Sequence, residues 1–214
     1  MSQRTRAELG ADLCRVMNTL AETGLNTGSA GNASVRTSIG LLVTPSGVKP
    51  AAMTPDSSVL IAKNSDVIGA GRPSSEWRFH LDIYRARADA QAIVHVHSPY
   101  ATVLACLHEP IPAFHYMVAV SGGSRIPCAS YATFGTQALS DAVLEALGVG
   151  NACLIANHGL VTVGKDLDAA LNLTLEVESL ARQYCVAKSL GSPVLLDDAE
   201  MNRVLEKFKD YGSR

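Results

Sequence analysis

The sequence has no excess of either charge. Its 18 basic and 20 acidic residues give a formal net charge of −2, and charged residues make up 18% of the 214 positions. It contains no basic stripe and no acidic tail. Proteins that bind nucleic acids contact the phosphates with clustered lysine and arginine, so we do not expect a nucleic acid as a partner.

Long apolar runs are also missing. No stretch approaches the roughly 20 apolar residues that a membrane-spanning helix needs. The first ten residues, MSQRTRAELG, contain no apolar signal core. We therefore expect a cytoplasmic protein that has no membrane partner.

Paired cysteines are the third absence. The five cysteines are scattered without any CxxC spacing, and an odd number cannot all pair within one chain. We expect reduced thiols and assign none of them to a site. They are Cys14, Cys106, Cys128, Cys153 and Cys185.

What is present fits one α/β domain over residues 1–214. The length suffices for one substantial core, and the chain has neither a low-complexity linker nor an internal repeat. Helical periodicity over residues 9–20 is followed by a turn-rich tract and then by alternating strand and helix patterns. These patterns predict an α/β sandwich whose strands are too often linked as hairpins for a doubly wound parallel sheet.

Several elements can be predicted individually. We expect an edge strand at residues 58–62 and a helix whose first turn holds Pro73 and the serines after it. The run AIVHVHS predicts a strand followed by a helix, and residues 152–164 predict two strands joined at a turn. Two helices are expected to close the chain, the last one over residues 197–212.

Two histidines interrupt the apolar strand AIVHVHSPY. Side chains alternate along a strand, so His95 and His97 lie on the same face, with Cα atoms roughly 6 to 7 Å apart. Two imidazoles at that spacing can share one Zn²⁺ ion, although they could equally be core histidines with satisfied hydrogen bonds. A metal site requires a further ligand.

His158 and Glu76 are the candidates for further ligands. His158, in ANHGL, follows an apolar strand and precedes a glycine, which suits an exposed ligand at a strand end. Glu76, in PSSEW, is predicted to lie in the first turn of a helix, where the helix dipole also explains a carboxylate. His80, His108 and His115 have no such context, and we expect them to be structural or surface residues.

Three turns supply groups that bind phosphate. TGSAGNAS, TPSG and the PSS before the helix offer small hydroxyls and clustered backbone N–H groups. Each can also be an ordinary turn. Taken together with the histidines, they indicate a phosphorylated small molecule held near a metal.

The order of these motifs carries a resemblance. SAGNAS, TPSG, PSSEW, HVHSPYAT, HYM and NHGL together resemble the class II aldolase and adducin family. RPSSEWRFH, FHYMVAVSGGSRIPCASYATFGT and VLEKFKDYG look most like bacterial L-fuculose-1-phosphate aldolases. The resemblance spans nearly the whole chain. It implies a three-layer α/β/α sandwich around a largely antiparallel mixed sheet.

The resemblance also implies the site. A Zn²⁺ ion would be bound by Glu76, His95, His97 and His158. A phosphate pocket would be built from Asn32, Ser46, Gly47, Ser74 and Ser75. The remaining residues it implies are Tyr116, which would reach a neighbour's site in a homotetramer, and Phe134, Phe208 and Tyr211, which would line or close the pocket.

The implied reaction is reversible cleavage of a ketose-1-phosphate to dihydroxyacetone phosphate and an aldehyde such as L-lactaldehyde. Glu76 would return a proton to carbon, and Tyr116 would exchange the proton of the C4 hydroxyl. Two positions depart from the aldolases that the sequence resembles most. Asn157 replaces a histidine, which could alter the surroundings of the metal, and Ser46 replaces a threonine.

Other interpretations of the substrate and the activity are compatible with these motifs. 5-Deoxyribulose-1-phosphate and 5-methylthioribulose-1-phosphate share the dihydroxyacetone phosphate half of the substrate. Sugar-phosphate epimerases and sugar-acid decarboxylases use the same zinc site, but the HYM tyrosine argues against them. The adducin head is a non-catalytic binding module on this fold, and it lacks the complete set of ligands.

Overall fold

The computed structural model describes residues 4–210 and contains both strands and helices. The strands are β1 (Asn32–Thr37), β2 (Gly40–Val43), β3 (Val59–Ala62), β4 (Val67–Ile68), β5 (Ala92–Val96), β6 (Cys128–Ala129), β7 (Ala152–Ile155) and β8 (Gly159–Gly164). The α-helices are α1 (Arg6–Glu22), α2 (Trp77–Ala86), α3 (Pro99–Cys106), α4 (Gln137–Leu147), α5 (Leu167–Leu190) and α6 (Asp198–Asp210). Three short 3-10 helices are η1 (Pro50–Ala52), η2 (Pro55–Ser57) and η3 (Tyr116–Ser121).

Within the described residues the strands form one sheet in the order β4-β3-β2-β1-β5-β8-β7-β6. All neighbouring strands run antiparallel except β6 and β7, which are parallel. The prediction of a largely antiparallel mixed sheet is therefore confirmed. β5 lies in the middle, between β1 and β8, so both of its edges are hydrogen-bonded.

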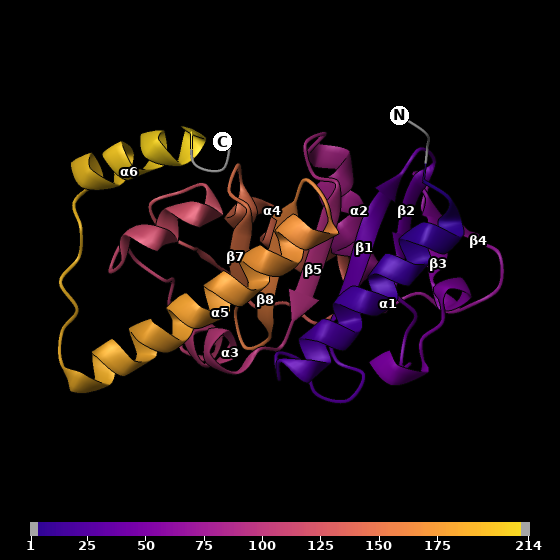
Figure 1. The fold of residues 1–214 in the computed structure, drawn as a ribbon, viewed down its shortest axis with the longest axis horizontal. Coiled ribbons are helices and arrows are strands. Elements are labelled where there is room, and N and C mark those ends of the chain that lie inside the picture. Colours follow the sequence, from indigo (N-terminus) through magenta and orange to yellow (C-terminus); the bar gives the residue numbers. More distant parts are fainter. Residues whose placement is uncertain (1–3, 211–214) are drawn as a thin grey trace.

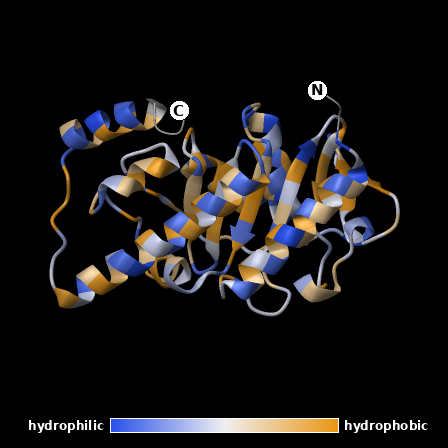
Figure 2. Ribbon diagram, viewed as in Figure 1, coloured by the Kyte–Doolittle hydropathy of each residue, from blue (hydrophilic) through white to orange (hydrophobic). Residues whose placement is uncertain are grey.

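Helices cover both faces of the sheet, which confirms the three-layer sandwich. In Figure 1, α1 and α5 cross in front of the strands while α2 and α4 lie behind them. One apolar core joins the sheet to α1, α3 and α5, and a second joins it to α2 and α4. Figure 2 shows the same division, with apolar strands between helices that are striped polar and apolar.

The side chains of β5 alternate between the two cores. Val94 and Val96 belong to the core under α1 and α5, whereas Ile93 belongs to the core under α2 and α4. His95 points the same way as Ile93, and its ring meets Phe79 of the second core edge-on at 5.6 Å. The twofold period of the strand therefore fixes which face carries the histidines.

Two sequence predictions about the fold are wrong in detail. β3 is not an edge strand, because the two-residue β4 pairs along its outer side. The helix predicted to start at Pro73 begins only at Trp77. Pro73 forms an isolated β-bridge with Pro45, and the Ser74 N–H donates to the Thr44 carbonyl, so this segment is extended. The last helix, α6, forms as expected and lies apart from the sheet beside η3 (Figure 1).

None of the helices in residues 4–210 has the length and apolar character to cross a membrane.

A carboxylate from α5 holds the start of α3. The two oxygens of Glu178 accept hydrogen bonds from the backbone N–H groups of Tyr100 (2.8 Å) and Ala101 (2.9 Å). The first N–H groups of a helix have no partner within the helix, and a negative charge there also interacts favourably with the helix dipole. Glu178 therefore fixes the place where the chain turns from β5 into α3.

We predict that Glu178→Ala lowers the free energy of unfolding by about 2 to 4 kcal/mol, because it removes two charge-assisted hydrogen bonds. Chemical denaturation followed by circular dichroism measures this loss. Glu145→Ala, on an exposed position of α4, is the control and should change stability by less than about 0.5 kcal/mol. Equal losses in both variants would show that the Glu178 contacts contribute nothing specific.

Candidate metal and substrate site

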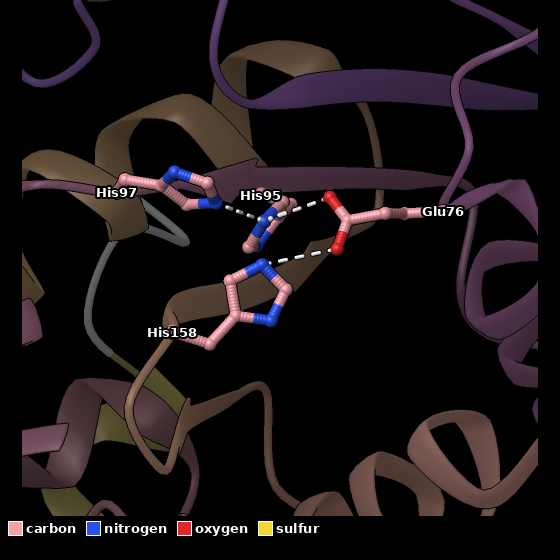
Figure 3. A group of neighbouring side chains, drawn as sticks. All are labelled: Glu76, His95, His97 and His158. Carbon is pink, nitrogen blue, oxygen red and sulfur yellow. Dashed lines mark hydrogen bonds and ion pairs between the residues drawn. The ribbon is translucent and has the colours of Figure 1, made fainter. Parts of the chain in front are cut away.

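Four side chains from three parts of the chain meet at one end of β5. His95 lies on β5 and His97 directly after it, His158 lies in the turn between β7 and β8, and Glu76 precedes α2. One ligand atom from each lies within 4.8 Å of the others. Figure 3 shows the three rings and the carboxylate pointing toward one another. The sheet has thus brought together all four residues predicted as metal ligands.

The contacts within this cluster are close. Nε2 of His95 is 3.1 Å from Nε2 of His97 and 3.1 Å from Oε2 of Glu76. The other carboxylate oxygen, Oε1, is 3.0 Å from Nε2 of His158. All three imidazoles therefore present the same nitrogen to a common point.

Hydrogen bonds fix the ring of His95 and the backbone of His97. Nδ1 of His95 lies 2.9 Å from the Leu160 carbonyl, which can only accept, so Nδ1 carries the proton and Nε2 keeps its lone pair for a ligand. The backbone N–H of His97 donates to Oδ1 of Asn26 at 3.2 Å. Gly31 makes room for this contact, because a Cβ there would lie 2.3 Å from Nδ2 of Asn26, and its φ of +72° also favours glycine.

The turn that carries His158 is held from α3. Asn157 adopts a left-handed φ of 54°, and its N–H donates to the Ala105 carbonyl at 3.0 Å. Nε2 of His108 lies 2.6 Å from Oδ1 of Asn157. His108 is therefore a surface residue, as expected, and Asn157 anchors the turn beside the cluster.

The electrostatics of the cluster suit a cation. Burial alone would raise the pKa of Glu76, yet His95 and His158 hold it well below its ordinary value. Burial would lower the pKa of His95, but the Glu76 carboxylate raises it, whereas burial and the neighbouring histidines lower the pKa of His97 to about 4. Oε1 of Glu76 is buried and accepts no well-formed hydrogen bond within the described part of the chain. A divalent ion would satisfy these converging lone pairs together, and three imidazoles with one carboxylate match its usual protein ligands.

A cavity of about 340 Å³ opens beside the cluster. Glu76, His97 and His158 form part of its wall. Every residue predicted for the phosphate pocket also lines it, together with the predicted aromatic residue: Asn32, Ser46, Gly47, Ser74, Ser75 and Phe134.

Sequence reasoning missed part of the cavity wall. Tyr131 and Asn157 line it, as do Ser29, Ala30, Gly31, Pro45 and Ala132. Tyr131 stands three residues before Phe134 in SYATFGT, and no periodic pattern marks an exposed aromatic in such a loop. The turn motif TGSAGNAS contains Ser29 and could have indicated it.

Tyr116 and Phe208 lie elsewhere. They line a separate cavity of about 560 Å³ between η3 and α6, and neither belongs to the wall of the first cavity. Tyr116 is 51% exposed. Within a single chain, the structure therefore does not bring these two aromatics to the metal ligands. Tyr211 falls outside the described residues.

Comparison with known proteins identifies the family. Residues 11–185 match the Class II Aldolase and Adducin N-terminal domain. The chain belongs to the class II aldolase and adducin family. The class II aldolases of this family are metal-dependent, and the cluster of one glutamate and three histidines is a group that can hold such an ion.

Individual class II aldolases are similar over nearly their whole length. The 5-methylthioribulose-1-phosphate/5-deoxyribulose-1-phosphate aldolase of Rhodospirillum rubrum is 51% identical over 94% of this chain and 90% of its own. The L-fuculose phosphate aldolase of Escherichia coli K12 is 46% identical over 95% of this chain and 94% of its own. A solved L-fuculose 1-phosphate aldolase superposes with a TM-score of 0.93 at 41% identity, covering 97% of this chain and 98% of the other.

We predict that His158→Ala lowers the content of bound divalent metal by tenfold or more, because it removes a ligand from a set of four. Elemental analysis of protein loaded with Zn²⁺ and then dialysed measures this content. His115→Ala is the control, since its imidazole lines the separate cavity between η3 and α6. If the His158 variant keeps full occupancy, the cluster is not the metal site.

Proposed function

We propose that the protein is a Zn²⁺-dependent aldolase that reversibly cleaves a ketose-1-phosphate to dihydroxyacetone phosphate and an aldehyde. The observation that carries this proposal is a cluster of four possible metal ligands, three of which line a cavity whose wall also contains the small hydroxyl and glycine turns. Three imidazoles and a carboxylate, without any thiolate, favour Zn²⁺. We expect the enzyme to act in the cytoplasm.

The turns would bind the phosphate group. Ser46 and Ser75 offer hydroxyls, and the Gly47 backbone turns into the cavity wall with a left-handed φ of 73°. Oγ of Ser74 accepts a hydrogen bond from the Glu76 N–H at 3.3 Å, which leaves the Ser74 hydroxyl proton free to donate. No lysine or arginine lines this cavity within the described residues. Neutral donors therefore fix the position of the phosphate, and so align the reacting carbons with Glu76.

The bound ion would supply Lewis-acid stabilisation of the negative charge that develops next to the substrate carbonyl, worth several kcal/mol. Glu76 is the carboxylate in the cavity wall, and its lowered pKa keeps it ionised at neutral pH. An ionised carboxylate beside the reacting carbon can remove a proton from it and return it. No lysine needs to form a Schiff base with the substrate.

The proton of the substrate's C4 hydroxyl needs another group. We assign it to Tyr116 of a neighbouring chain, because Tyr116 is exposed and its own chain holds it away from the metal ligands. This assignment requires an oligomer, and we propose a homotetramer with sites at the subunit boundaries. Phe134 would line the aldehyde side of the cavity, and Phe208 and Tyr211 would close it.

Two candidate substrate classes differ in the aldehyde that cleavage would release. The fuculose phosphate type is our first choice and yields L-lactaldehyde. The alternative is a 5-deoxyribulose or 5-methylthioribulose phosphate, which is favoured by the relative at 51% identity. Specificity constants for lactaldehyde, acetaldehyde, glycolaldehyde and methylthioacetaldehyde, each condensed with dihydroxyacetone phosphate, decide between them.

We predict that Glu76→Gln keeps much of the metal but slows exchange of the C3 proton of dihydroxyacetone phosphate by on the order of 10² or more. The amide can still bind a cation through its oxygen, but it cannot carry the proton. Proton NMR in deuterated water follows the exchange, and Glu145→Gln serves as the control. Exchange at the wild-type rate would contradict the role given to Glu76.

We further predict that Tyr116→Phe slows carbon–carbon cleavage by roughly 10² to 10⁴ while C3 proton exchange survives. Mixing inactive Tyr116→Phe chains with inactive His95→Ala chains should restore activity, because one chain supplies the ligands and its neighbour supplies the phenol. Mass spectrometry confirms that mixed oligomers have formed. If those oligomers stay inactive, Tyr116 does not serve a neighbour's site.

A further inference from the structure

A chain of buried polar side chains runs from Glu76 into the core between the sheet and α2. Nδ2 of Asn32 lies 3.0 Å from Oε2 of Glu76, and Oδ1 of Asn32 lies 2.6 Å from Nε2 of His80. Nδ1 of His80 lies 2.7 Å from Oγ of Ser34, which is 2.8 Å from the Tyr84 hydroxyl. We call Asn32, His80, Ser34 and Tyr84 the His80 relay.

The direction of every hydrogen bond in the relay follows from the negative charge of Glu76, which the relay contacts through Asn32. The ionised Glu76 can only accept, so Asn32 must turn its NH₂ group toward it. The amide oxygen of Asn32 then faces His80, so Nε2 of His80 must carry the proton. Nδ1 of His80 therefore accepts from the Ser34 hydroxyl, and the Tyr84 hydroxyl is left to donate to the oxygens of Ser34, including its carbonyl at 3.0 Å.

Burial makes this arrangement hard to reverse. The exposed fractions of Asn32, Ser34, His80 and Tyr84 are 2%, 0%, 0% and 4%. A flipped Asn32 would set its oxygen against the Glu76 carboxylate and its NH₂ group against the N–H of His80. Each such buried mismatch is unfavourable, because it leaves a polar group without a partner and away from water. Burial also lowers the pKa of His80 to about 3, so the ring stays neutral.

The backbone supports the same arrangement. Asn32 of β1 is the direct cross-strand partner of His95 on β5, so the relay begins beside a metal ligand. His80 lies on α2, one turn after Glu76, and its ring stacks on Phe79 with centroids 4.5 Å apart. Neither ring nitrogen of His80 is available to a metal or a substrate, because both are engaged within the core.

We propose that His80 is a positioning residue that holds the Glu76 carboxylate, through Asn32, in the orientation needed to bind the metal and carry the proton. The part of this proposal that concerns proton transfer by Glu76 rests on the proposed function. The part that concerns metal binding does not, because metal affinity can be measured without a substrate. It also assigns the side chain of Asn32 primarily to Glu76 rather than to the phosphate group.

The experiment compares His80→Asn with His80→Gln. Asparagine is too short to reach Asn32 from this position, whereas glutamine can place an amide N–H where Nε2–H stood. We expect His80→Asn to weaken Zn²⁺ affinity, measured by competition with a chromogenic chelator, by about 10- to 100-fold. C3 proton exchange should slow to a similar extent without a change in the KM for dihydroxyacetone phosphate. His80→Gln should restore most of both properties.

A buried substitution can act through stability alone, and a matched control separates that effect. Thr174→Val removes a hydroxyl from an equally buried pair, Thr162 and Thr174, whose oxygens are 2.7 Å apart on the other face of the sheet. It should lower the melting temperature without changing Zn²⁺ affinity. If His80→Asn does no more than this control, the proposal is overturned.

A double-mutant cycle tests whether His80 acts through Asn32. In an Asn32→Ala background, His80→Asn should change Zn²⁺ affinity by less than about twofold, because the link to Glu76 is already lost. Effects that multiply instead would show that His80 acts independently of Asn32, and would contradict the proposal.

Nitrogen-15 NMR of the wild-type protein provides a test that does not depend on any variant folding. The ring of His80 should show the neutral form protonated at Nε2, and protonation at Nδ1 would overturn the proposal. If the wild-type protein shows neither exchange nor cleavage, the proposed function fails. The Zn²⁺ and NMR measurements would still decide the role of His80.

Discussion

The site requires three imidazole nitrogens and a carboxylate to lie close together. The converging groups present lone pairs or negative charge to one another within 4.8 Å, and two of them, Glu76 and His95, are buried. A chain without a cation gains little from this arrangement, so the surrounding fold must hold it. It does so with paired strands on both sides of β5, a hydrogen bond from His95 to the Leu160 carbonyl, and the contact of Asn26 with the backbone of His97.

The elements that carry or adjoin the histidine ligands are stabilised by contacts outside the site. β5 is secured by two apolar cores, α3 is fixed at its start by Glu178, and the β7–β8 turn is tied to the end of α3 through Asn157. The site therefore lies where separately stabilised parts of the fold meet. Small residues such as Gly31 allow these parts to approach closely enough.

The sequence predicted the site correctly where the direction of a side chain follows from the local periodicity of a strand. The alternation of β5 correctly placed His95 and His97 on one face, and the hairpin that carries His158 was also foreseen. Glu76 could not be joined to them by spacing, because its distance from β5 is set by the packing of α2, and only the resemblance united the four. The links of Asn26 and His80 to the cluster depend on contacts across strands and helices, which no local pattern encodes. The two-residue β4 and the extended Pro73 segment were missed for the same reason.

Among the described residues, the cavity wall contains a carboxylate, Glu76, but no lysine or arginine. A sugar phosphate arrives with two negative charges, and the ionised Glu76 would repel it from an unloaded cavity whose other donors are neutral. A divalent ion held by Glu76 and the three histidines would reverse the sign of the local field. A phosphorylated substrate would therefore bind more tightly to the metal-loaded protein than to the metal-free protein, and metal binding would come first.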